Sequence, residues 1–425
     1  MDFSTIGQNL IIRTGIDDLM EDLYKAIHSG NPDICQLNGG SPAFFPEVSA
    51  LWHESLNKMA ASGEFDSLVG TYAHPRGDAK FIRVLVDYLN DKYNWQLTEK
   101  NIAVTQGGQM AFFLLFNLLG GPATGGGYRE ILFPICPDYI GYQPQSVFGA
   151  AVFRGIRPKI TILDKHSFKY GIDFGRLKIT PETAALCMSR PTNPTGNVVT
   201  DDEMARLHKL AAEAGVPLMV DGAYGAPLPN ICSVKATPVW DENVILTMSL
   251  SKIGLPGTRT GIIIAREEII DAIVRTVTTS ALCPNNLGQK LIAPYIEDRS
   301  IERICESLVV PFYQQKAEFA IRLIHELMPD NLPWKLHKNE GAMFLWMWME
   351  GLPITSQELY ERCRERGCFI NPGHHFFFAM DKEEYDSWPH TQECIRISFT
   401  QSDDILRRGL TILSEEIIKA YSEQH

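Results

Sequence analysis

Short, almost continuously apolar runs alternate with helix-like stretches between about residues 102 and 265. Runs that are apolar on nearly every position are typical of strands buried on both faces, as in parallel sheets. Five such runs stand out: "EILFP" (Glu130–Pro134), "AALCMSR" (Ala184–Arg190), "VPLMVD" (Val216–Asp221), "NVILTMS" (Asn243–Ser249) and "GIIIA" (Gly261–Ala265). The alternation predicts an α/β layered domain.

The clearest helix in this region follows the second of these runs. Thr200 can cap its first turn, and Glu203, three residues later, completes a capping box. Gly215 is expected to end the helix. The expected buried stripe consists of Met204, Leu207, Ala211 and Ala214.

The C-terminal part of the chain has a different pattern, which predicts a second, smaller unit. We expect a long helix at Pro311–Leu327, a strand at Gly341–Met349, a helix around Gln357–Arg366 and a strand at Cys394–Phe399. An N-terminal helix, Ile16–Ile27, is expected to pack on this unit or across an interface. We therefore expect a large α/β domain at residues 46–310 and a small domain made of residues 1–45 and 311–425.

Composition narrows the class of protein. The chain is 45% hydrophobic and 21% charged, and its net charge of −12 argues against a broad nucleic-acid or membrane surface. Nine cysteines with no CxxC pair favour free thiols in a reducing compartment and no metal site. The first residues lack a basic stretch followed by a long apolar core, so we expect no signal peptide and a cytoplasmic protein.

Polar motifs follow three of the predicted strands: "RPTNPTGN" (Arg190–Asn197), "DGAYG" (Asp221–Gly225) and "SLSK" (Ser249–Lys252). Taken singly, each has an ordinary explanation as a turn, a helix cap or a solvated lysine. Ligands in open α/β sheets bind beyond the carboxyl ends of the strands. Three such motifs on successive strand ends therefore predict one ligand site.

Together with "FPICPDYIGY" and "NPGHHFF", these motifs resemble those of the fold-type I pyridoxal-phosphate (PLP) aminotransferases over nearly the whole chain. Within that family, the sequence looks most like the valine–pyruvate group. The resemblance implies a large domain with a mostly parallel central sheet and a smaller α+β domain. It also implies PLP as the cofactor.

The resemblance assigns roles around the cofactor ring. Lys252 would form the Schiff base with the cofactor aldehyde and later move the substrate α-proton. Asp221 would pair with the pyridine nitrogen, while Tyr224 and Asn193 would hydrogen-bond the phenolate oxygen. Tyr139 would stack on the ring face.

The cofactor phosphate is expected to lie in "SLSKIGLPGTRTG" (Ser249–Gly261) and in "TQGGQMAFFLL" (Thr105–Leu115). Hydroxyl groups, a guanidinium fork and backbone N–H groups at a helix start all suit a dianion. The expected phosphate residues are Ser249, Ser251, Arg259, Gly107, Gly108 and Gln109. Tyr72, in "GTYAHPRG", resembles a tyrosine that reaches the phosphate of the neighbouring subunit, which implies a homodimer with shared sites.

Arg396 matches the family arginine that clamps the substrate α-carboxylate, with an arginine in the surface half of an edge strand as the alternative. Gly39 and Gly40 resemble a segment that closes over the substrate, or form a flexible turn. Asn193 is expected near the substrate as well. Phe44, Phe376, Phe377 and Phe378 suit either an aliphatic substrate pocket or a core.

Some positions depart from the family pattern. Gly108 stands where many relatives carry a hydroxyl residue, and Gly222 replaces a polar residue that is common after the aspartate. The spacing from Lys252 to Arg259 is one residue shorter than the commonest form. These departures affect how tightly the cofactor is held rather than its identity.

The function implied is transfer of the amino group between valine, or a similar aliphatic amino acid, and pyruvate, giving 2-oxoisovalerate and alanine by a ping-pong mechanism. A PLP β-lyase would use the same Lys, Asp and Tyr residues and stays open. A regulatory protein built on the same fold is disfavoured, because the chain is acidic and shows no basic helix-turn-helix segment. The only partners expected are amino acids, 2-oxo acids and a second copy of the chain.

Overall fold

The computed structural model describes residues 2–28, 30 and 33–423. Its core is a central eight-stranded sheet with the strand order β2-β11-β10-β9-β8-β4-β3, in which β5 also pairs with β4. The strands are β2 (Ile102–Gln106), β3 (Gly121–Pro122), β4 (Tyr128–Phe133), β5 (Phe153–Gly155), β8 (Thr183–Ser189), β9 (Leu218–Asp221), β10 (Val244–Ser249) and β11 (Thr260–Ile264). All five strands expected from the apolar runs are confirmed.

The central sheet is mixed. Five neighbouring strands run parallel to one another, in the order β10, β9, β8, β4 and β5. By contrast, β11 runs antiparallel to both β10 and β2. Only a short connection, Leu250–Arg259, joins β10 to β11, so the chain turns straight back without a crossover helix. The short connection therefore makes β11 antiparallel to both of its neighbours, and at the other edge of the sheet β3 runs antiparallel to β4.

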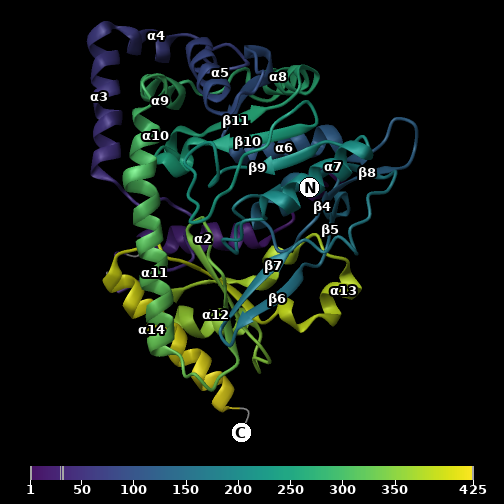
Figure 1. Cartoon of the computed structure of the whole chain (residues 1–425), viewed down its shortest axis with the longest axis vertical. Coiled ribbons are helices and arrows are strands. Elements are labelled where there is room, and N and C mark those ends of the chain that lie inside the picture. The colour runs from purple at the N-terminus through teal and green to yellow at the C-terminus, as the bar shows by residue number, and fades with distance from the viewer. Residues whose placement is uncertain (1, 29, 31–32, 424–425) are drawn as a thin grey trace.

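Helices cover the central sheet (Figure 1). Among them are α6 (Gly108–Leu119), which packs against β2, β10 and β11, together with α7 (Asp201–Glu213) and α8 (Glu267–Ala281). The capping box of α7 is confirmed, since Thr200 and Glu203 bond each other's backbone N–H groups. Ala214 is an exception to the predicted stripe: the helix ends at Glu213, and Ala214 is its exposed C-cap residue.

A second, six-stranded sheet has the order β15-β16-β13-β12-β7-β6. Its strands are β6 (Lys159–Asp164), β7 (Ser167–Gly171), β12 (Trp334–His337), β13 (Phe344–Met349), β15 (Asn371–Pro372) and β16 (Cys394–Ser398). The hairpin β6–β7 comes from inside residues 46–310, where sequence analysis expected only the large domain. The predicted division at residues 46 and 310 stays a prediction, with this hairpin as an addition to the second unit.

The predicted C-terminal helices are confirmed as α11 (Val310–Leu327) and α12 (Ser356–Glu365), and α14 (Asp403–Ser422) follows them. In Figure 1, α10 (Ser300–Ile304) and α11 run from the level of the central sheet down to that of the second sheet. The N-terminal α2 (Gly15–His28) lies between the two sheets in the same view. The predicted Ile16–Ile27 helix therefore sits at the junction of the two units.

The remaining elements complete the chain. They are α1 (Thr5–Leu10), α3 (Pro46–Ser62), α4 (Glu64–Gly70), α5 (Ala79–Tyr93), α9 (Leu287–Glu297), α13 (Lys382–Ser387), and the parallel pair β1 (Cys35–Gln36) and β14 (Cys368–Phe369). All nine cysteines are free thiols, and seven of them are buried. Across the described part of the chain, no helix is both long and apolar enough to cross a membrane.

Candidate functional site

The three predicted strand-end motifs open into one cavity of about 300 Å³ at the carboxyl ends of β8, β9 and β10. This is the expected place for a ligand in such a sheet. The predicted residues that line it are Gly40, Gly108, Gln109, Tyr139, Asn193, Asp221, Tyr224, Ser249, Ser251, Lys252, Arg259 and Arg396. Gly39, Gly107 and Tyr72 do not line it.

Lys252 lies in a short 3₁₀ turn, Leu250–Ile253, directly after β10. Its Nζ donates a hydrogen bond of 2.5 Å to the carbonyl oxygen of Gly40 and lies 5.2 Å from the centre of the Tyr224 ring. Burial, together with the cations of Arg396 and Arg259, lowers the pKa of Lys252 to about 8. The uncharged, nucleophilic form of this amine is therefore much more populated near neutral pH than that of an ordinary lysine.

Asp221, at the end of β9, is held by three donors. Its carboxylate accepts hydrogen bonds from the Tyr142 hydroxyl at 2.6 Å, the Ala223 backbone N–H at 2.9 Å and, at 3.5 Å, the Thr247 hydroxyl. Burial raises the pKa of Asp221, so a cationic partner in the cavity would be strongly favoured. Sequence analysis missed Tyr142, although it lies inside the quoted motif "FPICPDYIGY".

Arg396 is 2% exposed and is held by aromatic rings and by hydrogen bonds. Its guanidinium lies 4.2 Å from the ring centre of Phe344 and 5.2 Å from that of Phe376. The two Nη atoms donate to Asn193 Oδ1 and to the Asn38 carbonyl oxygen, both at 2.8 Å. The buried Nε has no hydrogen-bond partner among the described residues.

The alternative interpretation of Arg396 as an edge-strand surface residue is wrong. Strand β16 pairs with β13 on one side and β15 on the other, so Arg396 stands inside the sheet and points into the cavity. A buried guanidinium with a free donor is costly unless an acceptor completes it. Arg396 therefore suits the carboxylate of a ligand.

Hydroxyl groups and N–H donors gather at the other end of the cavity. Ser249 Oγ and Ser251 Oγ lie 3.1 Å apart, and Arg259 and the start of α6 border the same space. Gly107 has φ 85°, and a Cβ there would fall 2.3 Å from Arg259 Nη2, so only glycine lets the guanidinium lie over this turn. Two hydroxyls, a guanidinium and a helix N-terminus form a cradle for an anion.

Three residues of α2 form an apolar wall of the cavity: Ile16, Leu19 and Met20. The phenylalanines proposed from the sequence do not line it. Phe44 is 77% exposed, Phe376 and Phe377 are fully buried, and Phe378 packs on Phe133 and Phe153. The core explanation of Phe376, Phe377 and Phe378 is therefore correct, and the apolar surface comes from a helix whose position the sequence left open.

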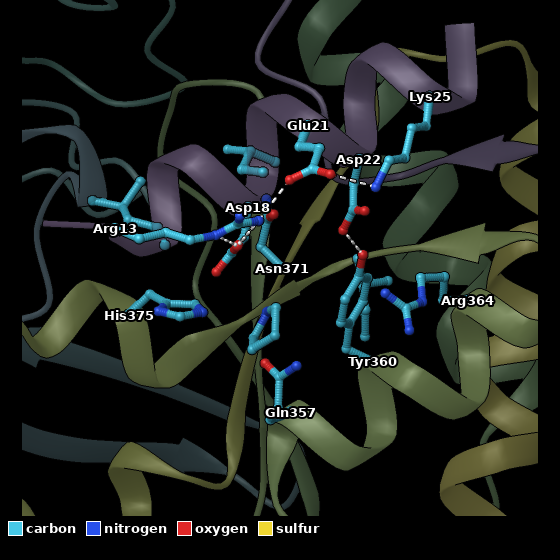
Figure 2. Close-up of a pocket in the computed structure, with 15 residues that line it drawn as sticks. Arg13, Asp18, Glu21, Asp22, Lys25, Gln357, Tyr360, Arg364, Asn371 and His375 are labelled. Atoms are coloured by element: carbon cyan, nitrogen blue, oxygen red, sulfur yellow. Dashed lines mark hydrogen bonds and ion pairs between the residues drawn. The ribbon is translucent and has the colours of Figure 1, made fainter. Parts of the chain in front are cut away.

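The other side of α2 faces a second, polar cavity of about 250 Å³ (Figure 2). Across it, the Tyr360 hydroxyl of α12 donates a hydrogen bond to the Asp22 carboxylate of α2. Arg13 pairs with Asp18 and Glu21 within the N-terminal segment itself. The Asp22–Tyr360 bond thus ties the helix that walls the first cavity to the second unit.

The chain is similar in sequence to a known protein family and to individual known proteins. The model of the family described as aminotransferase class I and II matches residues 153–413. Valine–pyruvate aminotransferase from Escherichia coli (strain K12) is 41% identical over 425 residues, with both chains covered completely. The chain belongs to the class I and II aminotransferase family.

Solved structures of this family share the fold. A putative amino-acid aminotransferase from Psychrobacter arcticum 273-4 matches with a TM-score of 0.94 and 38% identity, covering 99% of each chain. Valine–pyruvate aminotransferase from Salmonella typhimurium LT2 matches with a TM-score of 0.86 and 39% identity, covering 96% of this chain and all of the other.

Aminotransferases of this family depend on PLP, and the cavity fits that cofactor. The cradle of Ser249, Ser251 and Arg259 suits its phosphate, and the Asp221 carboxylate suits a protonated ring nitrogen. Lys252 lines the same cavity. Gly107 has no Cβ, which would collide with Arg259, so its turn leaves room for the anion in the cradle.

Proposed function

We propose that this aminotransferase moves an amino group between valine, or a similar aliphatic amino acid, and pyruvate, giving 2-oxoisovalerate and alanine in two half-reactions. The observation that carries the proposal is the Nε of buried Arg396, for which the described part of the chain offers no acceptor. Arg396 shares one cavity with Lys252 and the apolar wall of α2. These groups match the carboxylate, the amino group and the side chain of a small aliphatic amino acid. The relative named valine–pyruvate aminotransferase, 41% identical over its whole length, supports the same substrates.

Bound PLP supplies an electron sink that stabilises negative charge at the substrate α-carbon. Asp221 keeps a proton on the ring nitrogen, because its carboxylate is oriented by Tyr142 and the Ala223 N–H and gains from a cationic partner. Lys252 Nζ, whose pKa is lowered to about 8, moves the proton at the α-carbon.

Tyr224 and Asn193 would act as donors to the phenolate oxygen of the ring. Burial raises the pKa of Tyr224, so its hydroxyl keeps its proton. Asn193 Oδ1 is already engaged by Arg396, which leaves the Nδ2 amide as the donor. Tyr139 lines the same cavity and is proposed to stack on the ring face.

We further propose that the enzyme is a cytoplasmic homodimer in which Tyr72 reaches the phosphate of the neighbouring site. Tyr72 is 87% exposed and lies outside the cavity of its own chain, as a residue that acts on a second copy would. Gly39 and Gly40 are proposed to close over the substrate. In support of this, the Gly40 carbonyl oxygen accepts the hydrogen bond from Lys252.

The first test is the absorbance spectrum of the PLP-loaded protein, recorded alone, after L-valine and then after pyruvate. We expect a visible band that L-valine removes and pyruvate restores. Release of ammonia from an amino acid without any 2-oxo acid would instead indicate a β-lyase. A response only to other amino acids would contradict the valine assignment.

A pair of variants makes the test specific for Lys252. Lys252→Ala should abolish transamination and the lysine-linked visible band, whereas Lys382→Ala, on an exposed surface of α13, should leave both unchanged. Normal turnover by Lys252→Ala would contradict the proposed chemistry.

A further inference from the structure

Asp138 is a fully buried carboxylate that no step of the proposed reaction uses. It lies between β4 and Tyr139, behind the wall of the cavity rather than in its lining. Among the described residues, no Lys, Arg or His side chain bonds to it. A buried carboxylate without a cation is costly and needs strong hydrogen bonds to persist.

Three donors satisfy the Asp138 carboxylate. Oδ1 accepts hydrogen bonds from the Tyr139 backbone N–H at 2.7 Å and from the Ser189 hydroxyl at 2.5 Å. Oδ2 accepts one from the Ser189 backbone N–H at 3.0 Å. All three partners are donors, so the site requires an acceptor on both oxygens, which a carboxylate provides and an amide does not.

The chain of bonds continues to a residue that faces the ligand. Ser189 is the last residue of β8, and its Oγ accepts a hydrogen bond of 3.3 Å from the Asn193 backbone N–H. Asp138 therefore links two segments that are more than fifty positions apart in sequence. One segment begins with Tyr139, and the other contains Asn193. Both of these residues line the cavity, as does Ser189 itself.

We propose that Asp138 is a positioning residue of the transamination reaction. Through its bonds to Tyr139 and Ser189, Asp138 fixes the position of Tyr139, on the ring face, relative to Asn193, at the ring oxygen. It thereby sets the orientation of the cofactor ring. This inference rests on the proposed function, because it uses the roles assigned there to Tyr139 and Asn193.

The unfavourable burial of this group argues for such a role. Burial raises the pKa of Asp138 to about 7, with a smaller upward contribution from Asp221, and its three hydrogen bonds only partly oppose that rise. A linkage needed only for stability would be met at lower cost by apolar packing. What the carboxylate provides is a fixed geometry with two oxygens and three directed bonds.

Two variants test the linkage at different points. Ser189→Ala removes the hydroxyl that bonds Asn193 but keeps both backbone donors of Asp138. Asp138→Asn keeps one oxygen but turns an NH₂ group toward a backbone N–H. As a matched control, Asp201→Asn alters a carboxylate that also accepts several bonds, from Arg190 and Thr237, away from the cavity.

The readouts are the visible circular dichroism of bound PLP and the separate values of kcat and KM. PLP itself is achiral, so its visible dichroism reports how the protein holds the ring. We expect both site variants to bind stoichiometric PLP with altered dichroism, and kcat to fall about 10- to 100-fold with KM nearly unchanged, as misplaced reacting groups do. The double variant should lose little more than the more severe single variant, because both act in one chain of bonds.

Asp201→Asn should lower the melting temperature without changing the dichroism or kcat. If Ser189→Ala and Asp138→Asn behave in the same way, Asp138 is only structural and the proposal is overturned. Should Asp138→Asn fail to fold, an unchanged dichroism and kcat in Ser189→Ala would still overturn the proposal. Failure of wild-type protein to bind PLP would overturn the proposed function first, before any variant is compared, so the two failures are distinguishable.

Discussion

Lys252 has a lowered pKa because burial, and after it the charges of Arg396 and Arg259, oppose its own charge. This has a measurable consequence. The rate at which PLP recombines with the cofactor-free protein depends on the uncharged amine. We expect that rate to rise with pH up to about 8, the pKa of Lys252, and then to level off. Stopped-flow absorbance across a pH series would measure the midpoint.

Arg396→Leu is the matching variant. Arg396 is, after burial, the largest contributor to the lowered pKa of Lys252. Removing that cation makes the charged amine more stable, so the midpoint should move to higher pH. A wild-type midpoint near the ordinary lysine value of 10.5, or no upward movement in Arg396→Leu, would contradict this account.

Gly108 is the residue at which this chain lacks a hydroxyl that many relatives carry. It is the first residue of α6, its φ is not in the left-handed region, and a Cβ there would meet only the Ser249 Cβ, at 3.9 Å. Gly108→Ser should therefore fit without strain and add a donor to the phosphate cradle. We expect PLP to dissociate more slowly, with a Kd lower by about 5- to 10-fold, as one added hydrogen bond of about 1 kcal/mol gives.

The neighbouring Gly107→Ala is the control for this prediction. Gly107 has φ 85°, and its Cβ would collide with Arg259 Nη2 at 2.3 Å, so the same small addition one residue earlier should weaken PLP binding. Equilibrium dialysis would measure both. Equal effects of the two substitutions would show that the cradle does not have the geometry described here.

At this scale, the sequence predicted residues whose role follows from strand order. Asn193, Asp221 and Lys252 lie at the ends of successive strands, so their meeting could be foreseen. Tyr142 and Ser189 could not, because a hydrogen bond between distant segments depends on side-chain packing that no local pattern encodes. The phenylalanines at residues 376–378 show a related limit. Aromatic residues of a core and of a pocket look alike in sequence, so the sequence could not tell which of the two these residues belong to.

Among the elements, α2 supplies the apolar wall of the cavity. Ile16, Leu19 and Met20 project from it into the cavity, while Asp22 on its other side bonds Tyr360 (Figure 2). The helix is amphipathic, so the sequence predicted its existence, but two packing positions were compatible with the pattern. Only the tertiary structure shows that its apolar residues complete a ligand cavity.

Tyr360→Phe should loosen α2 without changing any residue of the cavity. The variant leaves Asp22 without the donor that ties the helix to α12. We expect KM for valine to rise about 3- to 10-fold, because part of the binding energy must then order the helix, with a smaller effect on kcat. Steady-state kinetics with hydrogen exchange of α2 would measure both effects.

Tyr385→Phe is the control, since it removes a tyrosine hydroxyl that accepts a bond from Gln392 away from the cavity. It should leave KM unchanged. Unaltered exchange of α2 and an unaltered KM in Tyr360→Phe would show that the Asp22–Tyr360 bond does not hold the helix.

The strands show where local patterns stop being informative. The buried runs correctly predicted five strands, and the Thr200 capping box correctly predicted the start of α7. The direction of β11 is set by the short connection after β10, and the hairpin β6–β7 joins a sheet whose other strands lie far away in sequence. The apolar pattern predicts which strand residues are buried. It predicts neither the direction of a strand such as β11 nor the sheet that the β6–β7 hairpin joins.

At the scale of the whole molecule, the cavity is built from both units. Lys252 and Asp221 come from the ends of the central sheet, Arg396 from the second sheet and the apolar wall from the N-terminal helix. Arg396 bonds Asn193 across this junction. The relative position of the two sheets therefore sets the distance between Arg396, proposed to bind the carboxylate, and Lys252, proposed to move the proton.

The largest-scale prediction concerns Tyr72, which is 87% exposed and lies outside its own cavity. If two copies share their sites, Lys252→Ala and Tyr72→Ala should each be impaired alone but complement each other when mixed. In a mixed dimer, one site combines the intact lysine of one copy with the intact tyrosine of the other. Random pairing restores about one quarter of the sites, since half of the dimers are mixed and each has one complete site.

The experiment is to unfold and refold the two variants together, or to co-express them, and to compare the activity with that of the variants prepared separately and then combined without exchange. Lys252→Ala mixed with wild type gives the reference for subunit exchange. Recovered activity in the exchanged mixture alone would establish that Tyr72 serves the partner's site. Absence of recovery, in a mixture where mixed dimers are demonstrated by differently tagged copies, would place the action of Tyr72 within its own chain or outside the site altogether.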